Sequence, residues 1–344
     1  MTAPRTLALV PPGSPGKDTV PPETVLLGLP ILRRTVLAAR RAGFVRVVAT
    51  GVSSDGPIGR VLQGTPAELL PAGSAPPPDA VLLPWNIVLR TGELKELLAG
   101  RAPSGLGVPV ESAADMARAE TWLLEGLIKD TDGLLSRHVH RRISLALSRR
   151  LAATRLTPNG MTLVSVAIGL VGALFFLSPR ASGQTAGALL FLLHSIVDGC
   201  DGELARLKVQ ESRFGGLLDF WGDNVVHCAV FTAIAVGWSL SARAPWPLLL
   251  GAVAVAGALA SAGLITRETM AGPKEGPLFT SVATAKTPVS RVADALARRD
   301  FIYLVLVLSL FGKANWFLGL SAVGAPAYFL VLVALRRNSE RKTK

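Results

Sequence analysis

Cysteine is almost absent from this chain, with two residues among 344, so a disulfide framework is excluded. Cys200 and Cys228 lie in apolar surroundings, and we expect small buried side chains. Histidine is also scarce, and His194 and His227, within hydrophobic stretches, are expected to be hydrogen-bonded interior groups rather than catalysts. Aromatic residues make up only 6%, which argues against nucleic acid, whose bases stack on aromatic side chains. The N-terminus lacks a basic segment followed by an apolar one, so we expect the first domain to stay in the cytoplasm.

Apolar sequence is abundant, because 50% of the residues are hydrophobic and the mean hydropathy is +0.44. Charge is unevenly distributed along the chain. Residues 1–120 carry 12 basic and 10 acidic side chains, a net charge of +2, whereas residues 121–344 carry 24 basic and 14 acidic side chains, a net charge of +10. The basic excess therefore belongs to the more apolar part. There it suits anionic headgroups and diphosphate-containing substrates rather than nucleic acid.

Six hydrophobic stretches are each near the length that spans a bilayer. They cover residues 160–178, 184–204, 214–240, 245–267, 300–313 and 315–335. Basic residues concentrate before the first stretch and after the second, fourth and sixth, whereas the opposite connections carry only Arg180, Arg243 and Lys313. The positive-inside rule then places both termini on the cytoplasmic side. We expect an α-helical, multi-pass protein of the cell membrane with six transmembrane helices.

The first 120 residues have the pattern of a small, Rossmann-type α/β domain. Residues 6–10 and 45–50 are expected strands, and residues 31–43 have helical spacing that ends in a glycine. A further strand and helix are expected at residues 80–83 and 93–98. This alternation predicts a parallel sheet with crossover helices.

Residues 121–156 are expected to form a linker and an amphipathic helix ahead of the membrane domain. Val139, Ile143, Leu147 and Leu151 recur every four residues between pairs of arginines. A helix of this kind lies in the headgroup layer with its apolar side toward the acyl chains. An ordinary surface helix packed on the first domain is the alternative.

Four carboxylates lie inside the apolar part of the chain, at Asp198, Asp201, Asp219 and Asp223. Ionised side chains at membrane depth are costly unless they are paired or functional. The first two are three residues apart and the last two are four apart, so on helices each pair shares one face. Two helices that present these acids to one space form a site for hard divalent cations, Mg²⁺ or Mn²⁺ rather than zinc. The alternative is that these acids only cap helices. Capping alone would not require glycines at fixed positions nearby.

Eight positions of this segment match the signature of the CDP-alcohol phosphatidyltransferase family, and the resemblance covers residues 157–344. The positions are Asp198, Asp201, Gly202, Ala205, Arg206, Gly215, Asp219 and Asp223. The resemblance implies transfer of a substituted phosphate group from a CDP-linked donor to an acceptor alcohol, with release of CMP. It also implies that Asp198, Asp201 and Asp219 bind metal, and that Asp223 is the general base and a further metal ligand. Two ions would clamp the diphosphate. Homodimers are common in the family, so a homodimer is one expected state.

The remaining motif positions are candidates for binding the nucleotide. Gly202 and Gly215 would let the backbone approach the cytidine and the phosphates closely, and tight helix packing is a second role for both. Ala205 would leave room for the base. Arg206 has two equally weighted interpretations, as a ligand of phosphate or as a partner of a motif carboxylate.

Thr157, Pro158 and Asn159 open the first hydrophobic stretch and resemble the T-P-N element of the same family. A threonine N-cap with proline at the first helical position accounts for the first two, and contact of Asn159 with the nucleotide is an additional functional interpretation. Arg267 and Arg299 lie at the cytoplasmic ends of hydrophobic stretches and are candidates for binding a phosphate on the acceptor. The competing interpretation is that each side chain only extends its charge to the interface, which we prefer for Arg299.

The first domain resembles the nucleotidyltransferase domain of sugar-phosphate and inositol-phosphate cytidylyltransferases, through its first strand, the segment L-G-L-P-I-L and the segment A-G-F-V-R-V-V-A-T-G. It departs from active members at two places. Those hold triphosphate with an Arg and a Lys after a Gly-rich loop, whereas this loop has only Lys17. They also place a metal-binding Asp after the later strand, where this chain has Pro84, Trp85 and Asn86. We expect a degenerate, non-catalytic domain; a working cytidylyltransferase is the alternative.

Three features together resemble the bifunctional inositol-phosphate cytidylyltransferase/di-inositol-phosphate-phosphate synthases. They are the stretch from Lys129 to Arg142, the degenerate first domain, and the segment Arg299-Asp300-Phe301. Without a working cytidylyltransferase loop the chain needs a ready-made donor such as CDP-diacylglycerol, which slightly favours phospholipid synthesis over transfer from CDP-inositol to inositol phosphate. A cation-binding membrane transporter is the alternative of another class, because acids in membrane spans also suit ion transport. Ion transport would not require an arginine and two glycines at these fixed offsets.

Overall fold

The computed structural model describes residues 6–12, 20–101, 105–128, 140–271 and 301–342. Clustering divides the chain into two compact units. The first contains residues 1–129 together with 149–155 and 204–210, and the second contains residues 130–148, 156–203 and 211–344. Two short segments from the apolar part of the sequence therefore belong to the same unit as the N-terminal residues.

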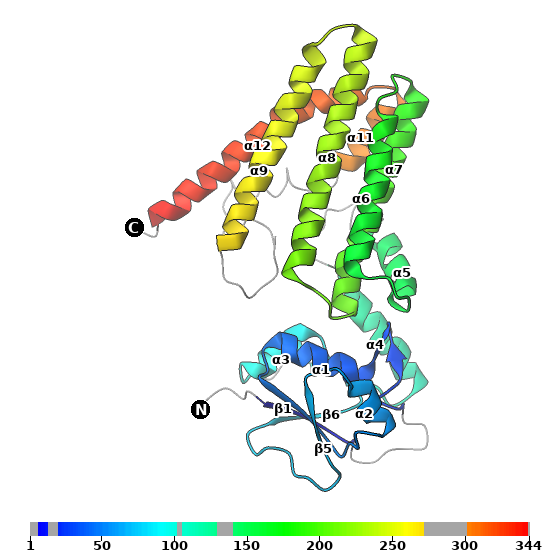
Figure 1. Ribbon diagram of the computed structural model, residues 1–344, viewed down its shortest axis with the longest axis vertical. Coiled ribbons are helices and arrows are strands. Elements are labelled where there is room, and N and C mark those ends of the chain that lie inside the picture. The colour runs from blue at the N-terminus through cyan, green and yellow to red at the C-terminus, as the bar shows by residue number, and fades with distance from the viewer. Residues whose placement is uncertain (1–5, 13–19, 102–104, 129–139, 272–300, 343–344) are drawn as a thin grey trace. The chain divides into compact units, whose positions relative to one another are not determined.

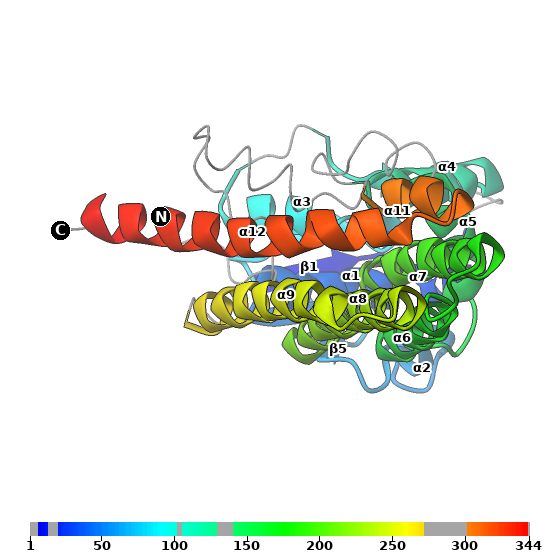
Figure 2. The same ribbon diagram turned by 90° about the horizontal axis from the view of Figure 1, so that it is seen from above.

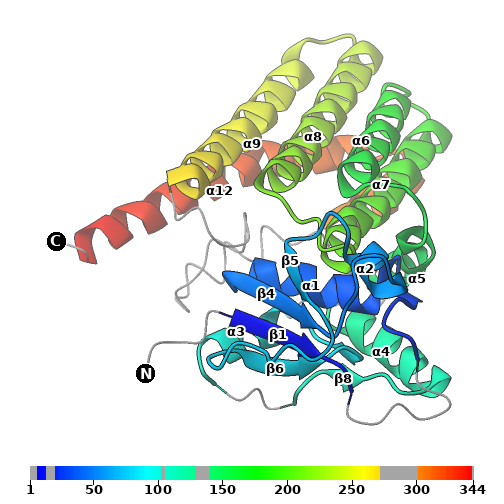
Figure 3. The ribbon, with the colours of Figure 1, turned by 60° about the horizontal axis from the view of Figure 1, so that its bottom comes forward.

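The first unit is built on a parallel sheet with the strand order β5-β4-β1-β6 (Figure 3). β1 (Thr6–Val10) pairs with β4 (Arg46–Thr50) on one side and with β6 (Val81–Pro84) on the other, and β5 (Ala67–Leu70) pairs with β4. β1 and β4 are largely apolar and buried, as strands covered on both faces are. The expected parallel sheet is present, with strands at the expected residues.

Helices and two short two-stranded sheets complete this unit. The helices are α1 (Ile31–Ala42), α2 (Pro57–Leu62), α3 (Thr91–Leu98) and α4 (Ala113–Glu125). α1 ends at Gly43, whose φ of 110° favours glycine, and it contributes Leu32 and Val36 to a core shared with Leu7 and Val47. β2 (Val25–Leu26) pairs antiparallel with β3 (Leu29–Pro30), and β7 (Ile87–Val88) pairs with β8 (Val108–Pro109).

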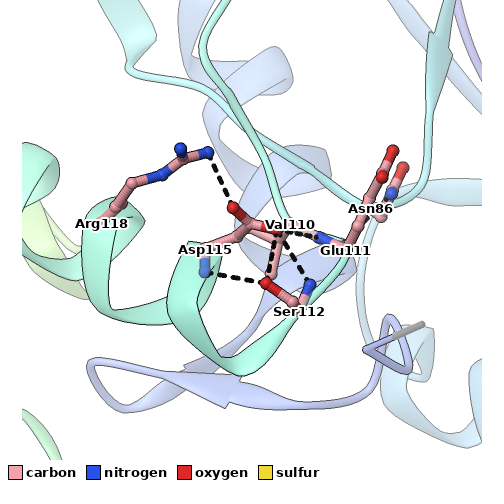
Figure 4. A network of polar contacts seen from close by, with 6 residues as sticks. All are labelled: Asn86, Val110, Glu111, Ser112, Asp115 and Arg118. Carbon is pink, nitrogen blue, oxygen red and sulfur yellow. Dashed lines mark hydrogen bonds and ion pairs between the residues drawn. The ribbon is translucent and has the colours of Figure 1, made fainter. Parts of the chain in front are cut away.

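The start of α4 is held by a capping box (Figure 4). The Asp115 backbone N–H donates to Ser112 Oγ at 3.3 Å, and the Asp115 carboxylate accepts from the Ser112 and Glu111 backbone N–H groups at 2.9 and 3.1 Å. The Ser112 hydroxyl also donates to this carboxylate, at 2.9 Å, and together these bonds lower the pKa of Asp115.

The side chains of Trp85 and Asn86, which follow β6, both make hydrogen bonds to backbone carbonyl groups. Asn86 Nδ2 donates to the Val110 carbonyl at 3.3 Å, and the Val110 N–H donates to the Asn86 carbonyl at 2.7 Å (Figure 4). Trp85 Nε1 donates to the Leu9 carbonyl at 3.0 Å. These two side chains therefore support the fold of the first unit.

The apolar part of the chain forms long helices, of which α8 and α9 lie side by side (Figures 1 and 2). The helices are α5 (Arg141–Ala152), α6 (Pro158–Phe175), α7 (Ala181–Leu207), α8 (Arg213–Ala242), α9 (Trp246–Ala271), α11 (Phe301–Leu310) and α12 (Ala314–Lys342). The last turn of α7 and the end of α5 fall within the segments that belong to the first unit. A core of residues such as Phe191, Val230 and Phe317 holds the second unit together.

Among the described residues, four helical segments are long and apolar enough to cross a membrane, namely Pro158–Phe175, Arg213–Ala242, Trp246–Met270 and Ala314–Arg337. They correspond to the first, third, fourth and sixth expected spans. The second expected span lies in α7, which carries three acidic residues near its end, and the fifth corresponds to α11, which is only ten residues long. The six-span arrangement and its orientation therefore stay predictions.

The amphipathic helix α5 packs on α7 through a polar face, and its expected place in the headgroup layer stays a prediction. Ile143, on the expected apolar stripe, is 48% exposed, whereas Ser144 and Ser148 are buried. The reason is polar, because Ser144 Oγ donates to the carboxylate of Glu203 on α7 at 2.7 Å. Val139, the first residue of the stripe, lies outside the described residues.

Candidate metal centre

The helices α7 and α8 bring three of the motif acids to one place. Asp198 and Asp201 lie on α7, three residues apart and therefore on one face, and Asp219 lies on α8. One carboxylate oxygen from each of the three lies within 4.8 Å of the others. Asp198 is 2% exposed and Asp201 6% exposed, while Asp219 is half-buried. Three carboxylates so close together repel one another unless cations or protons compensate their charge.

The donor set fits a hard divalent cation. It offers carboxylate oxygens without sulfur or imidazole, and such ligands suit Mg²⁺ or Mn²⁺. Residues 198, 201 and 219 would hold the ion.

Asp223, the expected base, is half-buried one helical turn beyond Asp219. Its Oδ1 lies 3.4 Å from Nε2 of His194, a buried residue of α7. The other ring nitrogen of His194, Nδ1, lies 2.9 Å from the carbonyl oxygen of Ser165 on α6. Because a carbonyl oxygen only accepts, Nδ1 carries a proton. His194 thus links α6 to Asp223. The expectation of a hydrogen-bonded interior histidine holds, but its partner is a motif acid.

Two residues near the cluster were not expected from the sequence to contact it. His194 lies four residues before Asp198 on α7, so it shares the face of the motif acids, and this spacing was the available signal. Thr162, one turn into α6, donates a hydrogen bond through Oγ1 to Oδ2 of Asp201. No feature of the local sequence points to Thr162, because its partner lies on another helix.

The T-P-N element begins α6 as the capping rules require. Thr157 Oγ1 accepts a hydrogen bond from the Gly160 N–H at 3.1 Å, and Pro158 occupies the first helical position. Asn159 lies beside α8, where a Cβ added to Gly215 would come within 2.9 Å of Asn159 Oδ1. Gly215 therefore leaves space next to Asn159.

The other candidates lie at the ends of their helices. Gly202, Ala205 and Arg206 occupy the last two turns of α7 and are half-buried. Arg267 is exposed, close to the end of α9. Arg299 lies outside the described residues, as does Lys17 of the first domain.

A buried ion pair lies beside the cluster. Glu203 of α7 has a fully buried carboxylate, which accepts hydrogen bonds from Arg141 Nη1 at 2.9 Å and from Ser144 Oγ at 2.7 Å, both on α5. A buried carboxylate is stable only when it is paired and hydrogen-bonded. This pair fixes α5 against α7 within the second unit.

Residues 155–330 match the family model described as CDP-alcohol phosphatidyltransferase. Among curated proteins, the chain is 39% identical over 133 residues to a bifunctional IPC transferase and DIPP synthase of Thermococcus kodakarensis, which covers 38% of this chain and 30% of the relative. The protein of the same name from Rubrobacter xylanophilus is 37% identical over 182 residues, 50% of this chain and 40% of the relative. The matched segments thus span between about a third and two fifths of these relatives.

Two further similarities concern proteins named for phosphatidylinositol phosphate synthesis. The phosphatidylinositol phosphate synthase of Mycobacteroides abscessus is 34% identical over 110 residues, 31% of this chain and 49% of the relative. The crystal structure of the Mycobacterium tuberculosis phosphatidylinositol phosphate synthase with CDP-DAG bound has 22% sequence identity and a TM-score of 0.39, and the match covers 56% of this chain and 94% of that chain.

Proposed function

Because this chain belongs to the CDP-alcohol phosphatidyltransferase family, we propose that it transfers a substituted phosphate group from a CDP-linked donor to an acceptor alcohol and releases CMP. The observation that carries the proposal is the convergence of Asp198, Asp201 and Asp219 within 4.8 Å. A diphosphate donor brings negative charge to the site, and a cluster of carboxylates accepts it only together with divalent cations.

The acidic cluster is the proposed binding site of Mg²⁺ or Mn²⁺, with two ions. When bound, these ions neutralise the diphosphate and stabilise the charge on the attacking and leaving oxygens. Asp198, Asp201 and Asp219 hold them, and Thr162 keeps the Asp201 carboxylate in one orientation through its hydrogen bond.

Asp223 is the proposed general base and a further metal ligand. It accepts the proton of the acceptor hydroxyl, whose oxygen forms a bond to the donor phosphorus next to the transferred alcohol. The bond between that phosphorus and the bridging oxygen breaks, and CMP leaves with that oxygen and the bond electrons. The contact with His194, at 3.4 Å, restricts the positions that the Asp223 carboxylate adopts. A base must be held within hydrogen-bonding reach of the proton that it takes.

The residues proposed to bind the nucleotide are Asn159, Gly202, Ala205, Arg206 and Gly215. Gly215 leaves space beside Asn159, and there the backbone can approach the cytidine and the phosphates. On α7, Gly202 allows the backbone to approach the nucleotide, and Ala205 leaves room for the base. Arg206 is proposed to neutralise the charge of the phosphates. Arg267, exposed near the end of α9, is the proposed ligand of a phosphate on the acceptor.

The proposed donor is CDP-diacylglycerol, which makes the reaction a step of phospholipid synthesis at the cytoplasmic face of a cell membrane. Several similar curated proteins are named for phosphatidylinositol phosphate or CDP-diacylglycerol chemistry. A second candidate is transfer from CDP-inositol to inositol phosphate, which the bifunctional relatives favour by their names. The structural roles of Trp85 and Asn86 in the first unit argue that this chain does not make its own CDP-inositol.

The test is a panel of reactions with the purified full chain in detergent and Mn²⁺. CDP-diacylglycerol and CDP-inositol are each combined with inositol phosphate, inositol, glycerol phosphate and serine, and CMP release and lipid products are measured. We expect CMP only when a donor, an acceptor and a divalent cation are all present. Cation flux into liposomes, without CMP release from any pair, would instead support a transporter.

A further inference from the structure

Arg34 of α1 is a buried cation whose partners are backbone carbonyl groups. Its side chain is almost entirely buried, with 3% of the residue exposed. Nη1 donates to the carbonyl oxygen of Leu207 at 2.5 Å, and Nη2 donates to those of Leu26 and Leu27 at 2.6 and 3.1 Å. Burial of a charge without a neighbouring anion is costly, and the fold retains it at this position.

Leu207 is the last residue of α7, the helix that carries Asp198 and Asp201. The last carbonyl groups of a helix have no partner within the helix and carry partial negative charge. A guanidinium group that donates to one of them opposes fraying of the final turn. Arg34 therefore caps the C-terminal end of α7 inside the first unit.

The other two carbonyls belong to the β2–β3 hairpin. Its turn residues, Leu27 and Gly28, have φ values of 47° and 81°. A Cβ added to Gly28 would lie 2.0 Å from the Ala152 carbonyl oxygen, at the end of α5. The turn is therefore packed directly on the segment 149–155, which belongs to the same unit. Arg34 joins this turn to the end of α7.

The segment that follows α7 is also fixed. Lys208 Nζ donates to the Thr154 carbonyl at 2.8 Å, and the Gln210 N–H donates to the Ala205 carbonyl at 2.8 Å. Val209 adopts a φ of 53°, which a β-branched residue rarely adopts. The end of α7 is thus held in three ways. Gln210 bonds back to Ala205, Arg34 joins Leu207 to the β2–β3 hairpin, and Lys208 bonds to Thr154, just after α5.

We propose that Arg34 is a positioning residue for the metal cluster, and that holding the end of α7 is what the first unit contributes to the reaction. The proposal rests on the proposed function. Asp201 lies six residues before Leu207 on one continuous helix, which corresponds to about 9 Å. A shift or rotation of the last turn is therefore passed along the helix toward Asp198 and Asp201. Ligand sets tolerate displacements of only about 0.5 Å.

The experiment compares Arg34→Ala with Arg33→Ala in the full chain. Arg33 is the neighbouring arginine of α1 and donates to the carbonyls of Val61 and Gln63, so its removal costs similar bonds away from α7. Mn²⁺ binding is measured by electron paramagnetic resonance, and hydrogen exchange is measured on peptides from residues 199–210. We expect Arg34→Ala to weaken Mn²⁺ binding about tenfold, the lower end for a residue that orients ligands. Exchange at the end of α7 should also increase, while Arg33→Ala changes neither.

Chemical rescue separates positioning from folding. Guanidinium at millimolar concentration should restore Mn²⁺ binding to Arg34→Ala, because it can occupy the space between the three carbonyls. If Arg34→Ala does not fold, Arg34→Lys is measured instead. A smaller loss of Mn²⁺ affinity is then expected, because lysine keeps a cation but offers fewer donors than arginine. Unchanged Mn²⁺ affinity in a folded Arg34 variant would overturn the proposal. A wild-type protein that binds Mn²⁺ but releases no CMP would overturn the proposed function alone.

Discussion

Asp223 differs from the other motif acids in its surroundings. Its carboxylate lies one turn beyond Asp219, and its Oδ1 lies 3.4 Å from Nε2 of His194 on α7. The three acids of the cluster share their space with one another. Proton transfer by Asp223 is therefore separable from metal binding, in which Asp223 would be one ligand beside the three acids of the cluster.

Replacement of Asp223 by asparagine tests this separation. Asp223→Asn should reduce turnover at least about 10²-fold, the lower range for loss of a general base, because an amide accepts no proton from the hydroxyl. Binding of the CDP donor should survive, and Mn²⁺ affinity should fall less than in a variant of the cluster, since Asp198, Asp201 and Asp219 are unchanged. Asp219→Asn is the matched comparison and should lose Mn²⁺ affinity as well. Full turnover in Asp223→Asn would show that the base is another group.

A side chain at position 215 is expected to hinder binding of the donor. A Cβ at this position would lie 2.9 Å from Asn159 Oδ1 and 3.0 Å from Ser212 Oγ. Gly215→Ala should therefore raise the KM for the donor, with an overpacking cost of about 1–3 kcal/mol. Gly216→Ala, at the next residue, is the control. The double variant Gly215→Ala with Asn159→Ala should recover part of the loss if space is the cause. A KM that stays at the wild-type value would remove Gly215 from the nucleotide site.

At this scale the sequence predicted the acids but not the groups around them. Acidic residues three or four apart must share a face of a helix, so the gathering of Asp198 and Asp201 follows from spacing alone. The hydrogen bond from Thr162 to Asp201 joins residues 39 positions apart in the chain. Such a contact depends on how α6 packs on α7, which spacing does not determine.

The helix α5 shows why apolar spacing does not identify the face that packs on protein. Its apolar residues recur every four positions, yet Ile143 is exposed and Ser144 and Ser148 are buried. In a membrane protein an apolar side chain gains as much from lipid as from a protein core, so apolar spacing alone does not say which face packs on protein. The buried face is instead set by Glu203, whose carboxylate requires partners from α5.

The buried ion pair of Arg141 and Glu203 is expected to stabilise the packing of α5 on α7. Arg141→Met should destabilise the chain by about 3–5 kcal/mol, because it removes the cation from a fully buried carboxylate. Adding Glu203→Met to this variant should restore most of the loss. Arg142→Met, at an exposed neighbour on the same helix, is the control. The midpoint of thermal unfolding in detergent measures all four proteins. Equal stability of Arg141→Met and wild type would mean that the pair does not hold α5.

The stability that the capping box of α4 contributes is expected to depend on pH. Hydrogen bonds, first that of Ser112, lower the pKa of Asp115 in the folded chain. The stability that Asp115 contributes is therefore present above the ordinary Asp pKa of about 3.9 and is lost as the pH falls through the lowered value. Asp115→Asn should be less stable than wild type at pH 7, and the difference should disappear at low pH. Denaturation followed by tryptophan fluorescence measures it, with Asp55→Asn as the control for net charge. A pH-independent difference would contradict the assignment.

Several elements agree with the sequence patterns because local signals determine them. The strand Thr6–Val10 is a buried apolar run, and the helix Ile31–Ala42 ends at a glycine with positive φ. The end of α7 is different. Nothing in residues 204–210 indicates that they belong to a unit built from the N-terminal sheet, because the contacts come from Arg34, more than 170 positions away.

On the scale of the whole molecule, the chain combines an α/β unit with little net charge and an apolar part with a net charge of +10. The basic excess suits anionic lipid headgroups and a diphosphate donor. The α/β unit has a parallel sheet, and the side chains of Trp85 and Asn86 at its β6 strand make hydrogen bonds to backbone carbonyl groups. We therefore propose that the helical part carries the chemistry and that the α/β unit positions it.

Anomalous X-ray diffraction from crystals of the full chain grown with Mn²⁺ would locate the metal directly. We expect anomalous peaks among the carboxylates of Asp198, Asp201 and Asp219, with a second peak about 4 Å from the first when a CDP donor is added. Peaks only at other sites, or none at these three carboxylates under saturating Mn²⁺, would contradict the proposed metal site.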